Sequence, residues 1–542
     1  MKNHENAYLL QSGKISVGIE VGSTRIKTVA ITPDCHTIAT GSFEWENRFE
    51  AGYWTYHLDE MWKGIQESYG QMTRYIEQKY NVTMTQIASL GISGMMHGYL
   101  VFDDKENLLV PFRTWRNNNA TEAAVALREK LLREKFEVNI PERWSIAQLY
   151  QSILNQESHV AHISFMTTLS GYIHWRLTGE KVLGIGDASG MFPVDSVTQS
   201  YRQDLCEVFD ELLENHGYSH RIESILPKVN VAGQNSGELT TQGARLIDPT
   251  GKLRSGCPLC PPEGDAQSGM VATNSVAPYT GNVSVGTSIF AMIVLDKPLC
   301  HVYPEVDIVT TPSGHEVAMI HANNGTSDIN SWMGLFGEVL TAMGINFNQE
   351  ALFTTVLERA LDENADASHW LSYGYVSGEF ITGVSTGYPM LVRTRDGQLT
   401  LAHLMKTHLF STMSTLKIGI DLLQRNEHIR IDSIVGHGGL FKTPQVAQKY
   451  LAMALESPVR VMDTASEGGA WGMAVLANYS LHAHEQEFET YLKQRVFQQR
   501  SSTEYTPLPE DILQFSEYVA KFEAGLQLQE IAHQIFSKNT KN

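Results

Sequence analysis

Residues 15–31 read Ile-Ser-Val-Gly-Ile-Glu-Val-Gly-Ser-Thr-Arg-Ile-Lys-Thr-Val-Ala-Ile, a β-branched run interrupted by Gly22-Ser23-Thr24. The β-branched residues on both sides of the interruption predict strands at 15–21 and 28–31, joined by a glycine turn. Such a turn presents backbone N–H groups and hydroxyls in a small concavity, which suits a phosphate oxygen. Lys27 adds a positive charge three residues beyond Thr24.

The same pattern returns in the second half of the chain. Residues 281–291 read Gly-Asn-Val-Ser-Val-Gly-Thr-Ser-Ile-Phe-Ala, again strand, turn and strand, with Gly286-Thr287-Ser288 at the turn. Turns of this composition also occur in ordinary β-hairpins, so either turn alone is a weak signal. The repeat predicts two lobes built on one plan, with a nucleotide between them and a boundary near residues 271–279.

Composition and charge exclude several classes of protein. The 542 residues include 41 Lys and Arg against 60 Asp and Glu, a net charge of −19, which disfavours nucleic acids and anionic membranes as partners. The five cysteines are scattered, as is typical of reduced thiols. We find no apolar run of about 18 residues and no apolar core near the N-terminus. We therefore expect a cytoplasmic protein that neither spans a membrane nor carries a secretory signal.

A third glycine-rich site follows a strand-like run at 429–435. Gly436-His437-Gly438-Gly439 precedes Thr443 and Pro444, a suitable N-cap and first position of a helix. A glycine turn between a strand and a helix N-terminus favours nucleotide binding. The strings typical of P-loop and Rossmann phosphate sites do not occur in this sequence, so both of those folds lose their main support.

Two further segments carry candidate catalytic and binding residues. Asp265 lies in a proline- and glycine-rich turn, where a carboxylate could take a proton from a hydroxyl, although an Asp in such a turn more often caps backbone N–H groups. His97 ends the run Gly-Ile-Ser-Gly-Met-Met-His that follows a buried strand. A lone histidine is more often structural than functional.

Other short motifs have weaker support. Cys257 and Cys260 have the spacing of a zinc or redox pair, but no second such pair supplies the remaining ligands. The segment 383–387 fits G-x-S-x-G, yet Tyr388-Pro389 follows where a hydrolase needs a helix, so we interpret it as a loop.

With these motifs in order, the chain resembles the FGGY carbohydrate kinases of the actin-like ATPase superfamily over about residues 15–477. Residues 18–24 resemble the family's first phosphate motif and 286–288 its second, while Gly264-Asp265 matches the turn with the catalytic base. Residues 91–98 are similar to the segment of xylulose kinases in which Met-His-Gly contacts the ketose. The resemblance implies an ATP-dependent transfer of phosphate to a terminal hydroxyl of a ketose, with Mg²⁺.

The resemblance also implies a fold and a set of site residues. The fold is α/β, with two actin-like (ribonuclease H-like) domains and a nucleotide and sugar cleft between them. We expect an N-terminal tail at 1–14, a sugar-binding domain at 15–275, a nucleotide-binding domain at 276–484 and a helical tail at 485–542. The implied sugar contacts are Met96, His97, Gly98, Trp115, Arg116, Asn117 and Asp265, with Asp265 as the base. The implied ATP contacts are Gly22, Ser23, Thr24, Lys27, Gly286, Thr287, Ser288, Gly438, Gly439, Lys442 and Gln448, and the implied metal contact is Glu20.

Three positions depart from the family pattern, one of them Ala266, which follows the base where xylulose kinases tend to have Asn. Glu20 stands where the family usually has the Asp that helps to hold Mg²⁺, and Asn117 replaces the Asp of a Trp-x-Asp sugar contact. These changes motivate an alternative, a non-catalytic or regulatory protein that binds nucleotide or sugar. An actin-like assembly or chaperone ATPase is a third hypothesis, disfavoured by Met96-His97-Gly98 and Gly264-Asp265. The partners predicted are ATP and a small sugar, and a homodimer is left open.

Overall fold

A computed structural model describes residues 2–133, 139–219 and 221–537. Its contacts divide the chain into two compact units. Unit 1 comprises Met1–Ala277, Ile308–Val317 and Ser466–Arg500, and unit 2 comprises Pro278–Asp307, Ala318–Ala465 and Ser501–Asn542. Each unit is built on its own central sheet.

The sheet of unit 1 has the order β13 (Glu263–Gly264), β6 (Ser89–Gly94), β1 (Ser16–Val21), β2 (Arg25–Ile31) and β3 (Thr37–Glu44). β1 pairs antiparallel with β2 and parallel with β6. The turn between β1 and β2 is the predicted Gly22-Ser23-Thr24, so the predicted strand, turn and strand are confirmed.

The sheet of unit 2 has the order β16 (Val306–Thr310), β17 (Glu316–Ala322), β15 (Ile289–Val294), β14 (Thr280–Val285), β20 (Ser433–His437), β21 (Val459–Met462) and β22 (Ser502–Tyr505). β14 pairs antiparallel with β15 and parallel with β20. The order β17-β15-β14-β20-β21 therefore repeats the order β3-β2-β1-β6-β13 of unit 1. This repeat confirms the prediction of two α/β lobes on one plan.

Helices cover the sheets. In unit 1 they are α1 (Lys2–Gln11), α2 (Leu58–Tyr80), α3 (Thr121–Arg133), α4 (Ser145–Leu154), α5 (Leu169–Thr178), α6 (Ile185–Ser189), α7 (Gln203–Asn215), α8 (Ile222–Ile225), α9 (Thr241–Ile247), α10 (Asp265–Ala272), α15 (Gly469–Ser480) and α16 (Phe488–Tyr491). In unit 2 they are α11 (Ser327–Ala342), α12 (Gln349–Glu358), α13 (Leu401–Asp421), α14 (Pro444–Leu455), α17 (Pro509–Ala524) and α18 (Gln527–Ser537). Short helical turns include Ser158–His162 in unit 1 and Gly439–Lys442 in unit 2.

Smaller two-stranded pairings complete each unit. Unit 1 contains β4 (Arg48–Glu50) with β5 (Tyr53–Thr55), β7 (Leu100–Phe102) with β8 (Phe165–Thr167), β9 (Val182–Gly184) with β12 (Lys228–Asn230), and β10 (Val194–Asp195) with β11 (Ser200–Tyr201). Unit 2 contains β18 (Trp370–Tyr373) with β19 (Met390–Arg393).

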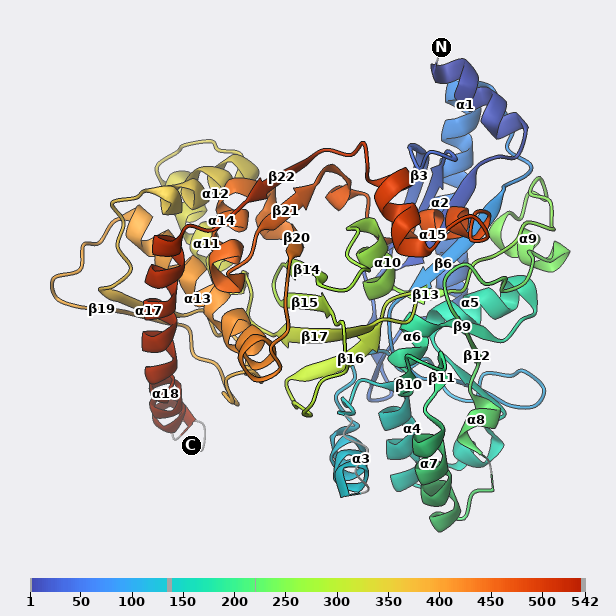
Figure 1. The fold of residues 1–542 in the computed structure, drawn as a ribbon, viewed down its shortest axis with the longest axis horizontal. Coiled ribbons are helices and arrows are strands. Elements are labelled where there is room, and N and C mark those ends of the chain that lie inside the picture. Colours follow the sequence, from blue (N-terminus) through green and yellow to red (C-terminus); the bar gives the residue numbers. More distant parts are fainter. Residues whose placement is uncertain (1, 134–138, 220, 538–542) are drawn as a thin grey trace. The chain divides into compact units, whose positions relative to one another are not determined.

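Helix α15 packs closely on the sheet of unit 1 (Figure 1). A Cβ atom added at Gly18 would come within 2.0 Å of the Ala470 carbonyl oxygen, and one at Gly91 within 2.4 Å of that of Met473. Glycine in β1 and β6 therefore lets the helix backbone approach the strands directly. This packing fixes the start of α15 beside the carboxyl end of β1.

The compact units differ from the predicted linear domains. Residues 466–484, predicted in the second domain, lie in unit 1 because α15 packs against β1 and β6. The segment predicted as an N-terminal tail carries α1, whose Leu10 is buried in the core of unit 1. The predicted helical tail is divided, since residues 485–500 join unit 1 while β22 extends the sheet of unit 2 and α17 packs on α13 and α14.

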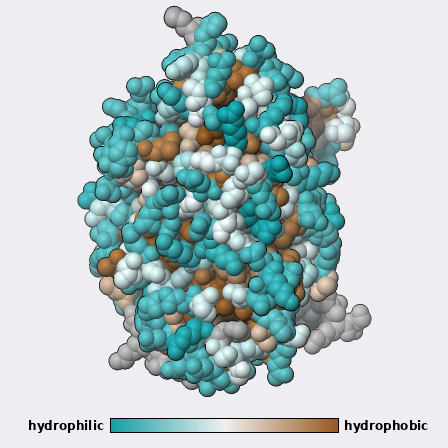
Figure 2. Space-filling view, turned by 90° about the vertical axis from the view of Figure 1, so that its right-hand side faces the viewer, coloured by the Kyte–Doolittle hydropathy of each residue, from teal (hydrophilic) through white to brown (hydrophobic). Residues whose placement is uncertain are grey.

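Apolar side chains are gathered in the interiors of the units. The face of the molecule in Figure 2 is mostly hydrophilic, and its hydrophobic residues form separate small patches. Across the described ranges, no helix combines the length and the hydropathy that a membrane span requires.

Candidate active site

The first glycine turn has all three of its carbonyl oxygens occupied. The Trp45 indole N–H donates to Gly22 O at 2.7 Å, and the Trp45 backbone N–H donates to Thr24 O at 3.2 Å. The Tyr56 hydroxyl donates to Ser23 O at 2.7 Å. Because these donors neutralise the oxygens that would repel an anion, the turn suits a phosphate group.

The second glycine turn, in unit 2, is built in the same way. Gly286 O accepts from the backbone N–H of Thr326 at 2.8 Å, and Thr287 O accepts from that of Gly325 at 2.7 Å. Ser288 O accepts from Gly286 N at 2.9 Å. Gly325 has no room for a side chain, because a Cβ there would lie 2.3 Å from Gly286 O. The two repeats therefore share the chemistry of the turn as well as its place in the sheet.

Asp265 is the first residue of α10, directly after β13. Its Oδ1 accepts hydrogen bonds from the backbone N–H of Met96 at 3.2 Å and of Ala266 at 3.1 Å. Burial raises the pKa of the carboxyl above its ordinary value, although these N–H donors act in the opposite direction. A fixed carboxylate with a raised pKa is suited to accept a proton from a hydroxyl.

Glu20 and Lys27 face each other across the β1–β2 pair; Glu20 binds the first turn of α15, and Lys27 binds the segment before that helix. Glu20 Oε2 accepts from Ala470 N at 3.1 Å, and Lys27 Nζ donates to the carbonyl oxygen of Glu467. Burial, and then the charge of Asp265, raise the pKa of Glu20 to about 7. Glu20 therefore anchors the N-terminus of α15 in addition to any role toward a metal.

The carboxylates present fit a magnesium ion. Within residues 2–133, 139–219 and 221–537, no three His, Cys, Asp or Glu side chains come together as a metal cage. Mg²⁺ commonly takes only one or two protein carboxylates, with water and substrate phosphates as its other ligands. Glu20 and Asp265, whose charges interact, supply a donor set of that kind.

His97 is buried and held in one orientation. Its backbone has φ of 63°, and its Nδ1 bonds the carbonyl oxygen of Gly190 at 2.8 Å. Its ring stacks on Trp144 with centroids 6.3 Å apart. Burial lowers the pKa of the imidazole to about 3, and the charge of Arg143 acts in the same direction. The ring is therefore neutral, with its proton on Nδ1, which leaves Nε2 as an acceptor.

The Trp115-Arg116-Asn117 segment carries further predicted sugar contacts. Asn117 Nδ2 donates to the carbonyl oxygens of Trp54 and Thr114 at 2.8 and 3.0 Å, and its Oδ1 accepts from Trp54 N at 2.8 Å. The Asn117 side chain thus bonds backbone groups, and its predicted sugar contact stays a prediction. Arg116 stacks over the Trp54 ring at 3.9 Å, and Trp115 is exposed.

The predicted nucleotide residues of unit 2 fall into two groups. Gly438, with φ of 96°, and Gly439 begin the short turn after β20, and a Cβ on Gly438 would lie 2.7 Å from Val285 O. Lys442 is exposed, 3.6 Å from the Glu350 carboxylate. Gln448 instead donates both amide hydrogens, to Val459 O at 3.1 Å and Thr503 O at 2.9 Å. Gln448 thus joins α14 to β21 and β22, and its predicted ATP contact stays a prediction.

Family models match most of the chain. Residues 15–271 match the N-terminal domain of the FGGY family of carbohydrate kinases, and residues 281–481 match its C-terminal domain. The chain belongs to the FGGY family of carbohydrate kinases. It is 22% identical to a xylulose kinase of Haemophilus influenzae over 413 residues, which span 75% of this chain and 78% of that protein.

Solved structures of FGGY kinases share the fold. A ligand-bound xylulose kinase from Lactobacillus acidophilus matches with a TM-score of 0.77 at 17% identity, covering 95% of this chain and 98% of that one. A glycerol kinase from Plasmodium falciparum with ADP matches with a TM-score of 0.72 at 15% identity, covering 94% and 98%. Because both match at low identity, the likeness shows the fold and leaves the sugar to be argued from the site.

Two buried carboxyls beside Asp265 had no predicted role in this FGGY kinase. Asp187 and Glu263 are both fully buried, and burial raises the pKa of each, that of Asp187 to about 7. Asp187 Oδ2 accepts the hydroxyls of Thr168 and Ser170. The signal in the sequence was a charged residue between Pro262 and Gly264, where an apolar or small residue would be expected beside a buried strand.

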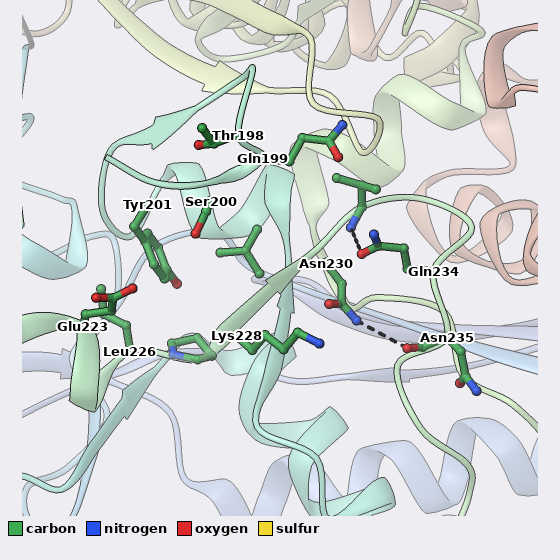
Figure 3. Close-up of a pocket in the computed structure, with 13 residues that line it drawn as sticks. Thr198, Gln199, Ser200, Tyr201, Glu223, Leu226, Lys228, Asn230, Gln234 and Asn235 are labelled. Atoms are coloured by element: carbon green, nitrogen blue, oxygen red, sulfur yellow. Dashed lines mark hydrogen bonds between the residues drawn. The ribbon is translucent and has the colours of Figure 1, made fainter. Parts of the chain in front are cut away.

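A separate polar cavity of about 600 Å³ lies in unit 1 of the kinase (Figure 3). Its lining comes from β11, α8, β12 and the loop after β12, and includes Tyr201, Glu223, Lys228, Asn230 and Gln234. The lining contains none of the predicted site residues. We therefore assign the cavity no part in the reaction.

Proposed function

We propose that this FGGY kinase transfers the γ-phosphate of ATP to a terminal hydroxyl of a ketose. The observation that carries the proposal is the joint placement of Asp265 and His97 in unit 1. Asp265 is bound by the backbone N–H of Met96, the residue next to His97. A carboxylate that accepts a proton and an imidazole that accepts a hydroxyl hydrogen bond thus lie on adjoining parts of one site.

Asp265 serves as the general base. It takes the proton of the attacking hydroxyl as the hydroxyl oxygen bonds to the γ-phosphorus and the bond from phosphorus to the ADP oxygen breaks. The backbone N–H groups of residues 23–24 and 287–288 hold phosphate oxygens, since those of Gly22 and Gly286 already donate to Arg25 O and Ser288 O. Glu20 and Asp265 would hold Mg²⁺, which would supply positive charge to offset that of the phosphate oxygens.

The class of sugar follows from the residues that would contact it. Neutral His97 offers Nε2 to a sugar hydroxyl. Met96-His97-Gly98 resembles the segment with which xylulose kinases contact their ketose, which supports this role. The relatives named as xylulose kinases support the same class. A ketopentose such as xylulose is therefore the first substrate to test.

Magnesium-dependent ADP release across pentuloses, hexuloses, heptuloses and polyols tests the proposal. We expect at least one ketose to raise ADP release well above the rate without sugar. Binding of ATP and a ketose without turnover of any sugar would instead support a non-catalytic protein. Asn117, one of the two residues that motivate this alternative, donates to the carbonyl oxygens of Trp54 and Thr114.

A further inference from the structure

Glu263 is a buried carboxyl that no step of the proposed reaction uses. It lies on β13, two residues before Asp265, and its side chain is fully buried. Its Oε2 accepts a hydrogen bond from the backbone N–H of Asp187 at 2.9 Å, and the carboxyl group also bonds the backbone N–H of Gly186. The carboxyl therefore joins β13 to the first turn of α6.

Two glycines make the space for this carboxyl. A Cβ atom on Gly184 would lie 2.4 Å from both Cδ and Oε1 of Glu263, and one on Gly186 would lie 2.5 Å from Oε2. In addition, Gly184 N donates to the carbonyl oxygen of Pro262 at 2.8 Å. The backbone around α6 is thus fitted to the Glu263 side chain, and a shorter or longer side chain would not fill the same space.

The other end of α6 holds His97. Gly190 follows the last residue of α6, and its carbonyl oxygen bonds His97 Nδ1 at 2.8 Å. Gly190 also packs directly against the imidazole, since a Cβ atom on Gly190 would lie 2.8 Å from His97 Nδ1. The orientation of the imidazole therefore depends on where α6 lies.

These contacts close into a ring. From Glu263 the path runs through α6 and Gly190 to His97, then to its neighbour Met96, whose N–H binds Asp265. The chain itself returns from Asp265 to Glu263. Glu263 is thus connected through hydrogen bonds and the backbone to both Asp265 and His97.

We propose that Glu263 is a positioning residue that fixes His97 relative to Asp265 through α6, and so sets the affinity and alignment of the sugar. This inference rests on the proposed ketose kinase activity. Glu263 touches neither substrate, so its loss should act on the sugar side of the reaction and leave nucleotide binding intact. A displacement of about 1 Å in such a site can cost up to about 100-fold in rate.

Four variants test the role. Glu263→Ala removes the carboxyl that binds the N–H groups of α6, and Glu263→Asp shortens the side chain by one methylene. Glu263→Gln keeps an oxygen that accepts from the α6 N–H groups and mimics a neutral carboxyl. Asp248→Ala is the matched control, because Asp248 is a buried carboxyl of the same unit that accepts from the N–H groups of Thr250 and Leu253.

Steady-state kinetics with the best ketose should separate the variants. We expect Glu263→Ala and Glu263→Asp to raise the KM for sugar about tenfold or more while the KM for ATP stays within about twofold. Glu263→Gln should restore the KM for sugar to near the wild-type value. Asp248→Ala should lower the melting temperature without changing either KM. An unchanged KM for sugar in Glu263→Ala, or a Gln variant as impaired as the Ala variant, would overturn the proposal.

If the wild-type protein phosphorylates no sugar, the proposed function is wrong, but the role of Glu263 can still be tested by a second measurement. ¹⁵N-histidine-labelled protein reports the His97 Nδ1–H signal, assigned by its loss in His97→Gln. We expect the signal to be the same in wild type and Glu263→Gln, and to be shifted or lost in Glu263→Ala. An unchanged His97 Nδ1–H signal in all three Glu263 variants would show that Glu263 does not position His97 through α6.

Discussion

The imidazole Nδ1 of His97 donates a hydrogen bond to the carbonyl oxygen of Gly190 at 2.8 Å. A carbonyl can only accept, so this contact fixes the tautomer and leaves Nε2 without a proton. Burial lowers the pKa of the ring to about 3, so the tautomer persists throughout the neutral range.

His97→Asn tests the acceptor role of Nε2. Asn can keep the bond to Gly190 from the position of Nδ1, and it tolerates the positive φ of 63° at this residue. It offers no acceptor at the position of Nε2, so we expect the KM for ketose to rise about tenfold, the cost of one lost hydrogen bond of about 1.4 kcal/mol. An unchanged KM for ketose would remove His97 from the sugar site.

Asn117→Asp restores the residue type that the family pattern has at this position. An aspartate cannot donate to the carbonyl oxygens of Trp54 and Thr114. Each would keep one backbone donor, Thr114 N and Asn117 N at 3.2 Å, but would face a carboxylate oxygen that repels it. We expect a loss of about 1–3 kcal/mol in unfolding free energy, measured by chemical denaturation. A variant as stable as wild type that gained affinity for sugar would show that Asn117 is a sugar contact after all.

Gly325→Ala tests the second phosphate turn. The new methyl would lie 2.3 Å from the Gly286 carbonyl oxygen, so the turn must move. We expect the KM for ATP to rise several-fold while sugar binding, measured by calorimetry, is unchanged. Gly334→Ala in α11 is the control, since a Cβ there has open space around it. Equal KM values for ATP in the two variants would argue that the turn at 286–288 does not bind the phosphates of ATP.

Stability should fall as pH rises through the neutral range. Asp187 and Glu263 hold their protons more tightly in the folded chain than the ordinary values of 3.8 and 4.5. Their stabilising contribution is therefore complete below about pH 4 and is lost as pH rises through the folded pKa, about 7 for Asp187.

Glu263→Gln should flatten this dependence, because the amide does not titrate. Melting temperatures at pH 5 and pH 8 would then differ less in the variant than in wild type, by about 2 °C or more. Parallel pH profiles for the two proteins would show that Glu263 does not titrate in this range.

The sequence predicts the repeated part of the fold well, because local patterns determine it. The β-branched runs at 15–21 and 281–285 and the glycine turns after them carry strand and turn propensity within a few residues. The placement of α15 depends instead on contacts across hundreds of residues, such as that of Gly18 with Ala470. The compact unit that contains this segment therefore does not follow the linear order of the chain.

Side-chain roles were harder to predict for the same reason. Asn117 and Gln448 match family positions, yet the backbone groups that they bind, at Trp54 and Thr503, become visible only in the folded chain. For Glu263 the sequence predicted no role, because the space for its side chain depends on two glycines about 80 residues earlier.

Detection of the phosphorylated sugar tests the central claim most directly. Wild type and Asp265→Asn are incubated with ATP, Mg²⁺ and the best ketose, and ³¹P NMR follows the sugar phosphate while calorimetry follows ATP binding. We predict a sugar monophosphate from wild type, and a rate about 10²–10⁴-fold lower from Asp265→Asn with ATP binding retained. Equal sugar phosphate formation by the two proteins would contradict the assignment of Asp265 as the base.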